Sequence, residues 1–441
     1  MLIDFTVENF KSFKEETVFS METDKKDILE DTNTISIRQN KRNHKKKLLK
    51  SAVLFGANAS GKSNFISILA AFRYYLFMKG KNKFVNDDFR FSDKRKYTKM
   101  EINILINEKI YNYILELDFE NKMIVSEIFY IIDERKDEPI YKRENNKITF
   151  YNKKIFSNYE TTINFINENL NESDSILTRL SEYRKPKEIE DFIEYLENMM
   201  IIWNSRFSVG EIGRLFYENK KAKENFIEYL KKFGFLIEDI EIIKEKEDEE
   251  LLKIIENMKN SFTGKEGNSI EMPEIDYRYN LKFIYKKNKK ESYSLNLSEQ
   301  STGTQKMIRL FLPIYNVLSN GGILIIDELD ESLHYKLIYD IIKMFNSVDI
   351  NKKNAQIIFT THNLLLLDLN IFRRDQIWFV ENKEIFKGTE LYSLSDINGV
   401  RKDSKILRDY LNGYFGGVPD IKKFGVNLWL EKREKIIKEN K

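Results

Sequence analysis

The sequence predicts an α/β fold in which a mainly parallel sheet is accompanied by an antiparallel β subdomain and a helical insertion. Three observations predict it. A short apolar run at 51–55 leads through a glycine-rich loop into a helix-like stretch at 65–72. A second apolar run, at 323–326, ends in two acids. Between 100 and 151 strand-like runs follow one another, and after about 161 the apolar spacing becomes helical.

The composition is that of a soluble globular protein with a heavily charged surface. Of 441 residues, 41% are apolar and 32% are charged, and the formal net charge is +3. This balance gives no global argument for binding nucleic acid or membranes. The basic run at 41–47 is a local exception, for which both a solvated loop and a nucleic-acid contact stay open. No cysteine is present, which excludes disulfides and a thiol nucleophile.

The N-terminus carries an early acid and lacks the basic-then-apolar order of a signal peptide, and no apolar run approaches the length of a membrane span. We therefore expect a cytoplasmic protein. Ile3, Phe5 and Val7 alternate with polar residues, which predicts a half-buried strand, with 17–20 as its hairpin partner. Further strands are expected at 102–106, 110–119, 124–132 and 148–151, forming an antiparallel sheet.

Residues 55–64 read FGANASGKSN, which fits the pattern G-x-x-x-x-G-K-[ST] with Gly56, Gly61, Lys62 and Ser63. A strand before the loop and a helix after it are the context that a phosphate-binding loop requires. Backbone N–H groups at the helix start would face the phosphates, Lys62 would bridge the β- and γ-phosphates, and the Ser63 hydroxyl would bind Mg²⁺. The alternative is an ordinary glycine turn before a helix.

The middle of the chain is expected to be a helical insertion. Apolar residues three and four apart predict a helix that includes Ile189, Phe192, Ile193, Leu196, Met199 and Met200. The stretch 245–265 is highly charged and is expected to be a mobile surface segment. We divide the chain into an N-terminal half of the main domain at 1–160, the insertion at 161–265 and the C-terminal half at 266–441.

Residues 321–328 read GGILIIDE and predict a buried central strand of a parallel sheet, with Asp327 and Glu328 at its C-terminal end, where open α/β sheets place their ligands. Asp327 would hold Mg²⁺ and Glu328 would polarise an attacking water; a buried strand ending in a charged turn is the alternative. About 265 residues separate Lys62 from Asp327, far more than a compact kinase or GTPase core needs. Because a guanine-selecting N-K-x-D is also missing, adenine is the better guess.

Two weaker signals lie near this strand. Ser301 and Gly303 stand at the start of an apolar helix, where a hydroxyl and unpaired N–H groups can meet an anion. His362 follows the β-branched run at 356–360 and could sense a γ-phosphate, whereas His44 and His334 are expected to be surface residues or helix caps.

The phosphate loop, Ser-x-Gly helix, acidic strand and strand-end histidine, in this order, resemble the head of an ATP-binding-cassette (ABC) ATPase. The closer resemblance is to the SMC and RecF branch, whose NF[KR]SF opening is similar to Asn9-Phe10-Lys11-Ser12-Phe13. The run DELDESLH at 327–334 resembles stand-alone bacterial ATPases related to the OLD family, and the similarity extends to 373–379 and 410–419. The chain thus resembles the abortive-infection type of AAA/ABC ATPase, a family commonly encoded beside a toxic effector.

The resemblance implies an ATP-hydrolysing switch that uses ATP and Mg²⁺ and closes as a homodimer, possibly a higher oligomer, with each ATP between the phosphate loop of one protomer and the Ser-x-Gly helix of the other. A separately encoded effector, such as a nuclease or another toxin, is the implied partner, and a membrane is not. The implied catalytic residues are Glu328 and His362, and the implied metal ligands are Ser63 and Asp327. The implied nucleotide-binding residues are Gly56, Asn58, Ser60, Gly61, Lys62, Ser63, Asn64, Ser301, Gly303, Asp330 and Lys11.

The chain departs from the family pattern in two places. Tyr335 stands where the family often has proline, and the region 87–91 offers no glutamine loop to complete the Mg²⁺ shell. The roughly 80 residues after His362 resemble the tail of the ATPase family, so no fused Toprim nuclease is expected. Two other functions stay open: a DNA-repair or chromosome ATPase that clamps DNA, favoured by the basic run, and a phosphotransferase, in which the Ser-x-Gly helix would have no role.

Overall fold

The computed structural model describes residues 1–24, 29–37, 47–85, 87–91, 97–132, 137–203, 209–246, 277–288, 290–382, 384, 386–401 and 404–418. Most of the basic run at 41–47, most of the charged segment at 245–265 and Pro419 lie outside the described residues. The chain separates into two compact units. The first contains Met1 and Asp191–Phe359, and the second contains Leu2–Glu190 and Thr360–Lys441.

An antiparallel sheet forms much of the second unit. Within the described residues its strand order is β10-β9-β8-β7-β6-β1-β2. The strands are β1 (Leu2–Glu8), β2 (Thr17–Ser20), β6 (Thr98–Ile106), β7 (Lys109–Asp118), β8 (Met123–Ile132), β9 (Glu138–Glu144) and β10 (Lys147–Tyr151). The predicted hairpin of β1 and β2 and the predicted strands between 98 and 151 are confirmed. β9 was not predicted, because its sequence carries more charged than apolar residues.

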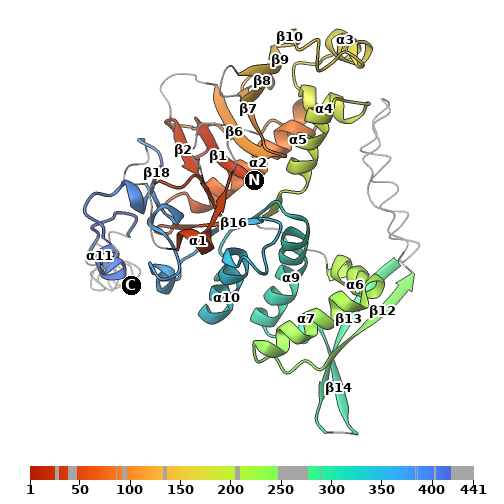
Figure 1. The fold of residues 1–441 in the computed structure, drawn as a ribbon, viewed down its shortest axis with the longest axis vertical. Helices are drawn as coiled ribbons and strands as arrows, with labels where there is room; N and C mark the ends of the chain where they lie inside the picture. Colours follow the sequence, from red (N-terminus) through yellow and green to blue (C-terminus); the bar gives the residue numbers. More distant parts are fainter. Residues whose placement is uncertain are drawn as a thin grey trace, which may run out of the picture. The chain divides into compact units, whose positions relative to one another are not determined.

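Helix α2 (Lys62–Phe77) packs against this sheet within the second unit (Figure 1). Its buried side chains include Phe65, Leu69 and Phe72. The Phe72 ring meets Phe5 of β1 edge to face at 5.6 Å and Tyr113 of β7 at 6.0 Å between ring centroids. The helix that begins at the glycine-rich loop is therefore fixed by aromatic contacts to two strands of the antiparallel sheet.

A second set of strands in this unit includes the strand that leads into the glycine-rich loop. β5 (Ser51–Phe55) is buried along its whole length and pairs in parallel with β17 (Ile377–Glu381), which pairs antiparallel with β18 (Glu390–Ser393). The motif at 373–379 supports this pairing. The fully buried Arg373 makes two hydrogen bonds to Asp375, at 2.9 and 2.7 Å, and Gln376 donates to the backbone oxygen of Ser51 at 2.8 Å. The motif therefore anchors the first residue of β5.

A buried polar network joins the antiparallel sheet to the C-terminal end of α2. Arg143 and Glu127 form an ion pair at 3.2 Å with both side chains fully buried. Glu127 also accepts the Ile176 N–H of α4 (Ile176–Ser181), and Ser175 at the α4 N-cap donates to the backbone oxygen of Leu76 at 2.7 Å. Because each charge has hydrogen-bonding partners, the network stabilises this packing although it is buried.

The first unit contains the second apolar run of the sequence. β15 (Ile323–Ile326) is buried throughout and pairs in parallel with β11 (Met200–Ile202) and β16 (Gln356–Thr360), as expected for a central strand. The helical expectation at Met199 and Met200 is wrong, because α5 (Lys187–Glu197) ends before them and Met200 begins β11. Helix α9 (Thr302–Asn320) precedes β15, and α10 (Tyr335–Asn346) follows it.

A small sheet in the same unit has the order β12-β13-β14, with β12 (Asp239–Lys246), β13 (Tyr277–Lys286) and β14 (Ser292–Asn296). Helices α6 (Val209–Glu218) and α7 (Lys220–Lys232) lie beside it (Figure 1). Phe226 and Phe283 are buried with Ile308 of α9 in one hydrophobic cluster. A methyl group on Gly213 would lie 2.7 Å from Cβ of Tyr279, so the close approach of α6 to β13 requires glycine there.

The remaining elements are short. They are α1 (Glu30–Asn33), β3 (Thr34–Ser36), β4 (Lys47–Leu49), α3 (Glu160–Glu168), α11 (Ile406–Leu411) and the 3₁₀ turns at Lys81–Lys83, Leu297–Glu299, Leu364–Leu366, Arg374–Gln376 and Leu394–Asp396. The predicted α/β architecture, with an antiparallel sheet and helices, is confirmed. In the part of the chain that the structure describes, no helix is long and apolar enough to span a membrane.

Candidate nucleotide site

The glycine-rich loop connects β5 to α2 through two residues with positive φ. Ala59 has φ +62° and Gly61 has φ +112°, both left-handed, and Gly61 is the N-cap of α2. The first N–H groups of a helix have no partner within it and carry the positive end of the helix dipole. The loop therefore forms an anion-binding concavity at the start of a 16-residue helix.

The Lys62 side chain lies across the loop. Its ammonium group donates to the backbone oxygens of Gly56 at 2.7 Å and Ala57 at 3.0 Å, and the residue is only 5% exposed. A lysine held in this way carries a positive charge into the concavity. Ser63, the next residue along α2, is exposed, so its hydroxyl can reach a ligand at the helix start.

Ser60 provides an independent sign of a ligand. Its hydroxyl is buried and has no hydrogen-bond partner within the described structure. The residue as a whole is only 5% exposed. Orphaned buried polar atoms are rare in folded proteins and call for an explanation. Gly56 admits no side chain, because a methyl group there would lie 2.6 Å from the Ser60 Oγ and 2.4 Å from the Val380 oxygen. An anion that accepts from Ser60, Lys62 and the backbone fits this arrangement.

The NFKSF motif forms a tight turn beside the loop. Phe10 and Phe13 are fully buried and exchange backbone hydrogen bonds of 2.8 Å, while Asn9 and Lys11 have positive φ. The Lys11 ammonium group donates to the Ser67 hydroxyl of α2 at 2.9 Å, and Asn64 donates to the Ser12 hydroxyl at 2.8 Å. The motif is therefore hydrogen-bonded to the first two turns of α2, through Lys11 to Ser67 and through Ser12 to Asn64.

Residues 87–91, where no glutamine was found, adjoin the same turn. The Lys11 N–H donates to the backbone oxygen of Asp87 at 2.5 Å, and the Tyr75 hydroxyl of α2 donates to its carboxylate at 3.1 Å. Asp87 is thus held to the NFKSF turn by its backbone and to α2 by its side chain.

His362 lies near the end of β5. The N–H of the preceding residue, Thr361, donates to the Leu54 oxygen at 3.2 Å, and the His362 side chain is exposed. Leu54 is two residues before Gly56, so the histidine segment and the phosphate loop leave the same edge of the strand. His334, by contrast, is the N-cap of α10, and its Nδ1 accepts the Lys336 N–H at 3.2 Å, as the cap prediction requires.

In the first unit, the two acids follow β15 directly. The Asp327 N–H donates to the Ile202 oxygen of β11 at 2.9 Å, which extends the parallel pairing by one residue. Glu328 has φ +51°, an uncommon conformation for glutamate, and is exposed. Strain of this kind, held at the end of a buried strand, is typical of functional sites. Asp330, two residues further on, is half-buried.

The Ser-x-Gly helix contacts the loop of these acids within the first unit. Ser301 is the N-cap of α9, and its hydroxyl accepts the Thr304 N–H at 3.2 Å. A methyl group on Gly303 would lie 2.6 Å from the Ser332 oxygen, so only glycine allows this contact. Lys306 of α9 donates to the Glu328 backbone oxygen at 2.7 Å, and burial lowers the pKa of Lys306 despite neighbouring carboxylates.

The predicted residues therefore form two groups. The second unit holds the phosphate loop with Lys11 and His362, and the first unit holds Ser301, Gly303, Asp327, Glu328 and Asp330. Sequence reasoning missed Thr389, whose hydroxyl donates to the Ser60 oxygen at 3.1 Å, and Lys306. Lys306 lies only three residues after Gly303 and could have been found by spacing. Nothing in the sequence around Thr389 distinguishes it.

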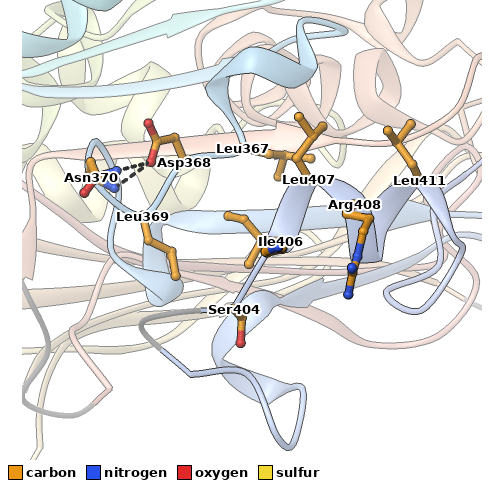
Figure 2. A pocket seen from close by; sticks show the side chains of 10 residues that line it. Leu367, Asp368, Leu369, Asn370, Ser404, Ile406, Leu407, Arg408 and Leu411 are labelled. Carbon is orange, nitrogen blue, oxygen red and sulfur yellow. Dashed lines mark hydrogen bonds between the residues drawn. The ribbon is translucent and has the colours of Figure 1, made fainter.

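A hollow of 480 Å³ lies away from the phosphate loop, between residues 367–370 and helix α11, as Figure 2 shows. Leu367, Leu369 and Ile406 line it, and Asp368 accepts both the backbone and the side-chain N–H groups of Asn370. None of the predicted site residues lines this hollow.

Among the described residues, no group of three or more His, Asp or Glu side chains is placed to hold a metal ion by protein ligands alone. Mg²⁺ bound with a nucleotide needs only one or two protein ligands, because phosphate oxygens and waters supply the others. The exposed Ser63 hydroxyl at the start of α2 fits that requirement.

A comparison with known families shows which family the chain belongs to. Residues 51–368 match the family described as "AAA domain, putative AbiEii toxin, Type IV TA system". The chain belongs to this AAA domain family. The matched region includes the phosphate loop, the Ser-x-Gly helix, both acids and His362. No curated protein is a significant match.

Solved structures with a similar chain path include heads of SMC proteins. An SMC head bound to the C-terminal winged-helix domain of ScpA is 14% identical, with a TM-score of 0.44, over 89% of this chain and 97% of that chain. The SMC head domain from Thermotoga maritima is 14% identical (TM-score 0.39, 89% and 98%), and that from Pyrococcus yayanosii is 13% identical (TM-score 0.40, 94% and 99%).

Proposed function

We propose that this AAA domain binds ATP at the phosphate loop and hydrolyses it. The observation that carries the proposal is the loop itself, which holds the Lys62 ammonium group across its backbone and contains a buried Ser60 hydroxyl without a hydrogen-bond partner in the described structure. Three kinds of donor then converge on one anion: an ammonium group, a hydroxyl and backbone N–H groups. Membership of the AAA family supports a nucleoside triphosphate as that anion. Adenine remains the favoured base, since a guanine-selecting motif is missing.

Each residue of the proposed site has a separate role in hydrolysis. Lys62 leaves the oxygens of Gly56 and Ala57 and neutralises charge on the β- and γ-phosphates. Ser63 and Asp327 would hold Mg²⁺, which would supply further charge neutralisation. Glu328 accepts a hydrogen bond from water and orients it for attack on the γ-phosphate. The uncommon backbone conformation of Glu328 supports this role, because it turns the residue away from the path of the strand.

We propose further that two chains share each nucleotide. In this arrangement the N-terminus of α9 in one protomer, with Ser301 and Gly303, contacts the γ-phosphate bound by the partner's Lys62. The exposed Ser301 and Thr302 at the start of a 19-residue helix support the assignment. His362 and Asp330 complete the contacts around the γ-phosphate, and Lys11 with Asn58 and Asn64 supports the loop. ATP then closes the dimer and hydrolysis releases it.

The biological role that we propose is the regulation of a separately encoded toxic effector. The family description, which names a toxin and a toxin–antitoxin system, supports it. A DNA-clamping ATPase is the second candidate, and the basic run at 41–47 favours it. DNA binding whose affinity falls steeply with salt would favour the clamp, and a neighbouring gene for a nuclease or another toxin would favour effector control.

The first test is ATP binding by calorimetry. Lys62→Ala removes the ammonium group and is expected to abolish measurable binding, whereas Lys81→Ala, an exposed lysine just beyond the far end of α2, leaves the affinity unchanged. Affinity of Lys62→Ala close to that of the wild type would remove the basis of the proposal. Absence of binding by the wild type would do the same.

A further inference from the structure

The C-terminal motif that the sequence analysis singled out returns to the phosphate loop. After α11 the chain makes a turn at 413–417, in which Gly416 and Gly417 have φ of +70° and +65°. The Tyr410 hydroxyl of α11 donates to the Gly417 oxygen at 2.9 Å. This segment, which we name the C-terminal turn (413–417), lies within the second unit together with the loop.

Glu381, the last residue of β17, holds the C-terminal turn. Its Oε1 accepts the Gly417 N–H at 3.0 Å, and its Oε2 accepts the Tyr392 hydroxyl at 3.2 Å. The Tyr392 hydroxyl also lies 2.7 Å from the Phe415 oxygen. Burial and the neighbouring Glu381 carboxylate raise the pKa of Tyr392, so its hydroxyl stays protonated and remains a donor.

The space around Gly416 is closed by these two side chains. A methyl group on Gly416 would lie 2.4 Å from the Tyr392 hydroxyl oxygen and 2.5 Å from Oε2 of Glu381. The positive φ adds a second requirement for glycine. Gly416 therefore lets the turn approach Glu381 closely enough for the Gly417 N–H to donate to it.

The same turn runs close to the first glycine of the phosphate loop. A methyl group on Gly417 would lie 3.7 Å from Cα of Gly56 and 3.7 Å from the Val380 oxygen. A methyl group on Gly56 would lie only 2.4 Å from that Val380 oxygen. Gly56 thus lies against Val380 of β17 and near the C-terminal turn, and its own oxygen accepts from Lys62.

We infer that Glu381 and the C-terminal turn are positioning elements of the nucleotide site, which fix Gly56 and thereby the phosphate loop in the conformation that receives phosphates. The inference rests on the proposed function, because it assigns ATP affinity to residues outside the loop. Glu381 has no role in hydrolysis itself. Its carboxylate is satisfied by the turn and by Tyr392, and its effect passes through Gly417 and Gly56.

Glu381→Gln tests the inference with little change in size. A glutamine keeps an oxygen that can accept the Gly417 N–H, but it lacks the carboxylate charge that strengthens this hydrogen bond, and its amide nitrogen cannot accept from the Tyr392 hydroxyl. We expect the Kd and KM for ATP to rise roughly tenfold, with kcat within about twofold of the wild type. Glu390→Gln is the matched control, since Glu390 is exposed and pairs with Glu381 across β17 and β18. It is expected to behave as the wild type.

Tyr392→Phe provides a second variant that removes one donor and keeps the ring. It is expected to raise the KM for ATP as well, by a smaller factor. A variant that only lowers the stability of the fold would leave KM unchanged at temperatures well below melting. If the wild type binds ATP, Lys62→Ala does not, and both Glu381→Gln and Tyr392→Phe bind as the wild type does, the inference fails while the proposed function stands. A fall in kcat at unchanged KM would also overturn it.

Discussion

At the scale of single residues, the proposed hydrolysis depends on one carboxylate in an uncommon conformation. Glu328 is exposed at φ +51°, two residues beyond the end of β15. Glu328→Gln keeps the size of the side chain and its hydrogen bonding but removes the negative charge that orients water. We expect ATP binding to be retained and turnover to fall at least roughly a hundredfold. Steady-state phosphate release and calorimetry measure the two quantities.

The control for this variant is Glu331→Gln, which alters an exposed acid of the same loop. It is expected to keep most of the turnover, because Glu331 follows the reactive pair by three residues and makes only a long contact to Lys306, at 3.4 Å. Normal hydrolysis by Glu328→Gln would show that another residue activates the water.

A second residue-scale prediction concerns stability. Arg143→Met leaves Glu127 fully buried without its cation and removes the hydrogen bonds that Arg143 donates to loop oxygens. We expect a loss of about 3–5 kcal/mol. Lys187→Met, which breaks an exposed pair with Glu190 in the same unit, should cost less than about 0.5 kcal/mol. Thermal unfolding measures the stability of both variants. Equal melting temperatures would show that the buried ion pair contributes no more to stability than the exposed one.

At the scale of elements, most strands and both central helices followed from sequence pattern. The strands β1, β5, β15 and β16 have continuous or alternating apolar residues, and the structure places each where the pattern does. The pattern failed where tertiary contacts override it. β11 has three residues and continues a helical spacing, so only its pairing with β15 makes it a strand.

Two further strands were missed for a different reason. β9 includes Arg143, which is charged and yet fully buried by its pairing with Glu127, so the usual link between polarity and exposure fails there. β12 mixes acids and isoleucines that face opposite sides of a three-stranded sheet, inside a stretch that was predicted to be helical. Of the site, the phosphate loop and the two acids could be predicted from short motifs. The support from Thr389 and Glu381 could not, because more than 300 residues separate them from the loop.

The N-terminus of α9 is the element whose proposed role is easiest to contradict. Ser301→Arg places a bulky cation at an exposed helix start, where a partner's nucleotide is proposed to lie. We expect ATP affinity to stay near the wild-type value and hydrolysis to be lost. Ser347→Arg, at the C-cap of α10, is the control and should hydrolyse ATP normally. Wild-type turnover by Ser301→Arg would exclude a role for this helix in hydrolysis.

At the scale of the whole molecule, the proposed dimer predicts that two variants, each inactive alone, regain activity when they are mixed. Lys62→Ala and Ser301→Arg are each expected to be inactive. In a mixed dimer, however, one of the two shared sites lacks both groups and the other has both intact. With random exchange of protomers, activity of about a quarter of the wild-type value returns if the two sites act independently.

Mixing the purified variants and following phosphate release tests this directly. Exchange must be shown in parallel, for example with two different affinity tags that purify together. If protomers exchange and no activity returns, the independent shared-site model is wrong. Activity that depends on the ratio of the two variants, with a maximum at equal amounts, would support it.

The pairing of β5 with β17 also determines when the phosphate loop can form during synthesis of the chain. The strand that leads into the phosphate loop is made early, at 51–55, yet its parallel neighbour comes only at 377–381 and the turn against Gly56 only at 413–417. Contacts between such remote segments form late, because the intervening chain must be present first. A growing chain on the ribosome therefore holds a complete GKS motif long before it holds a formed loop. Nucleotide binding at the proposed site therefore requires that the chain has been made as far as residues 413–417.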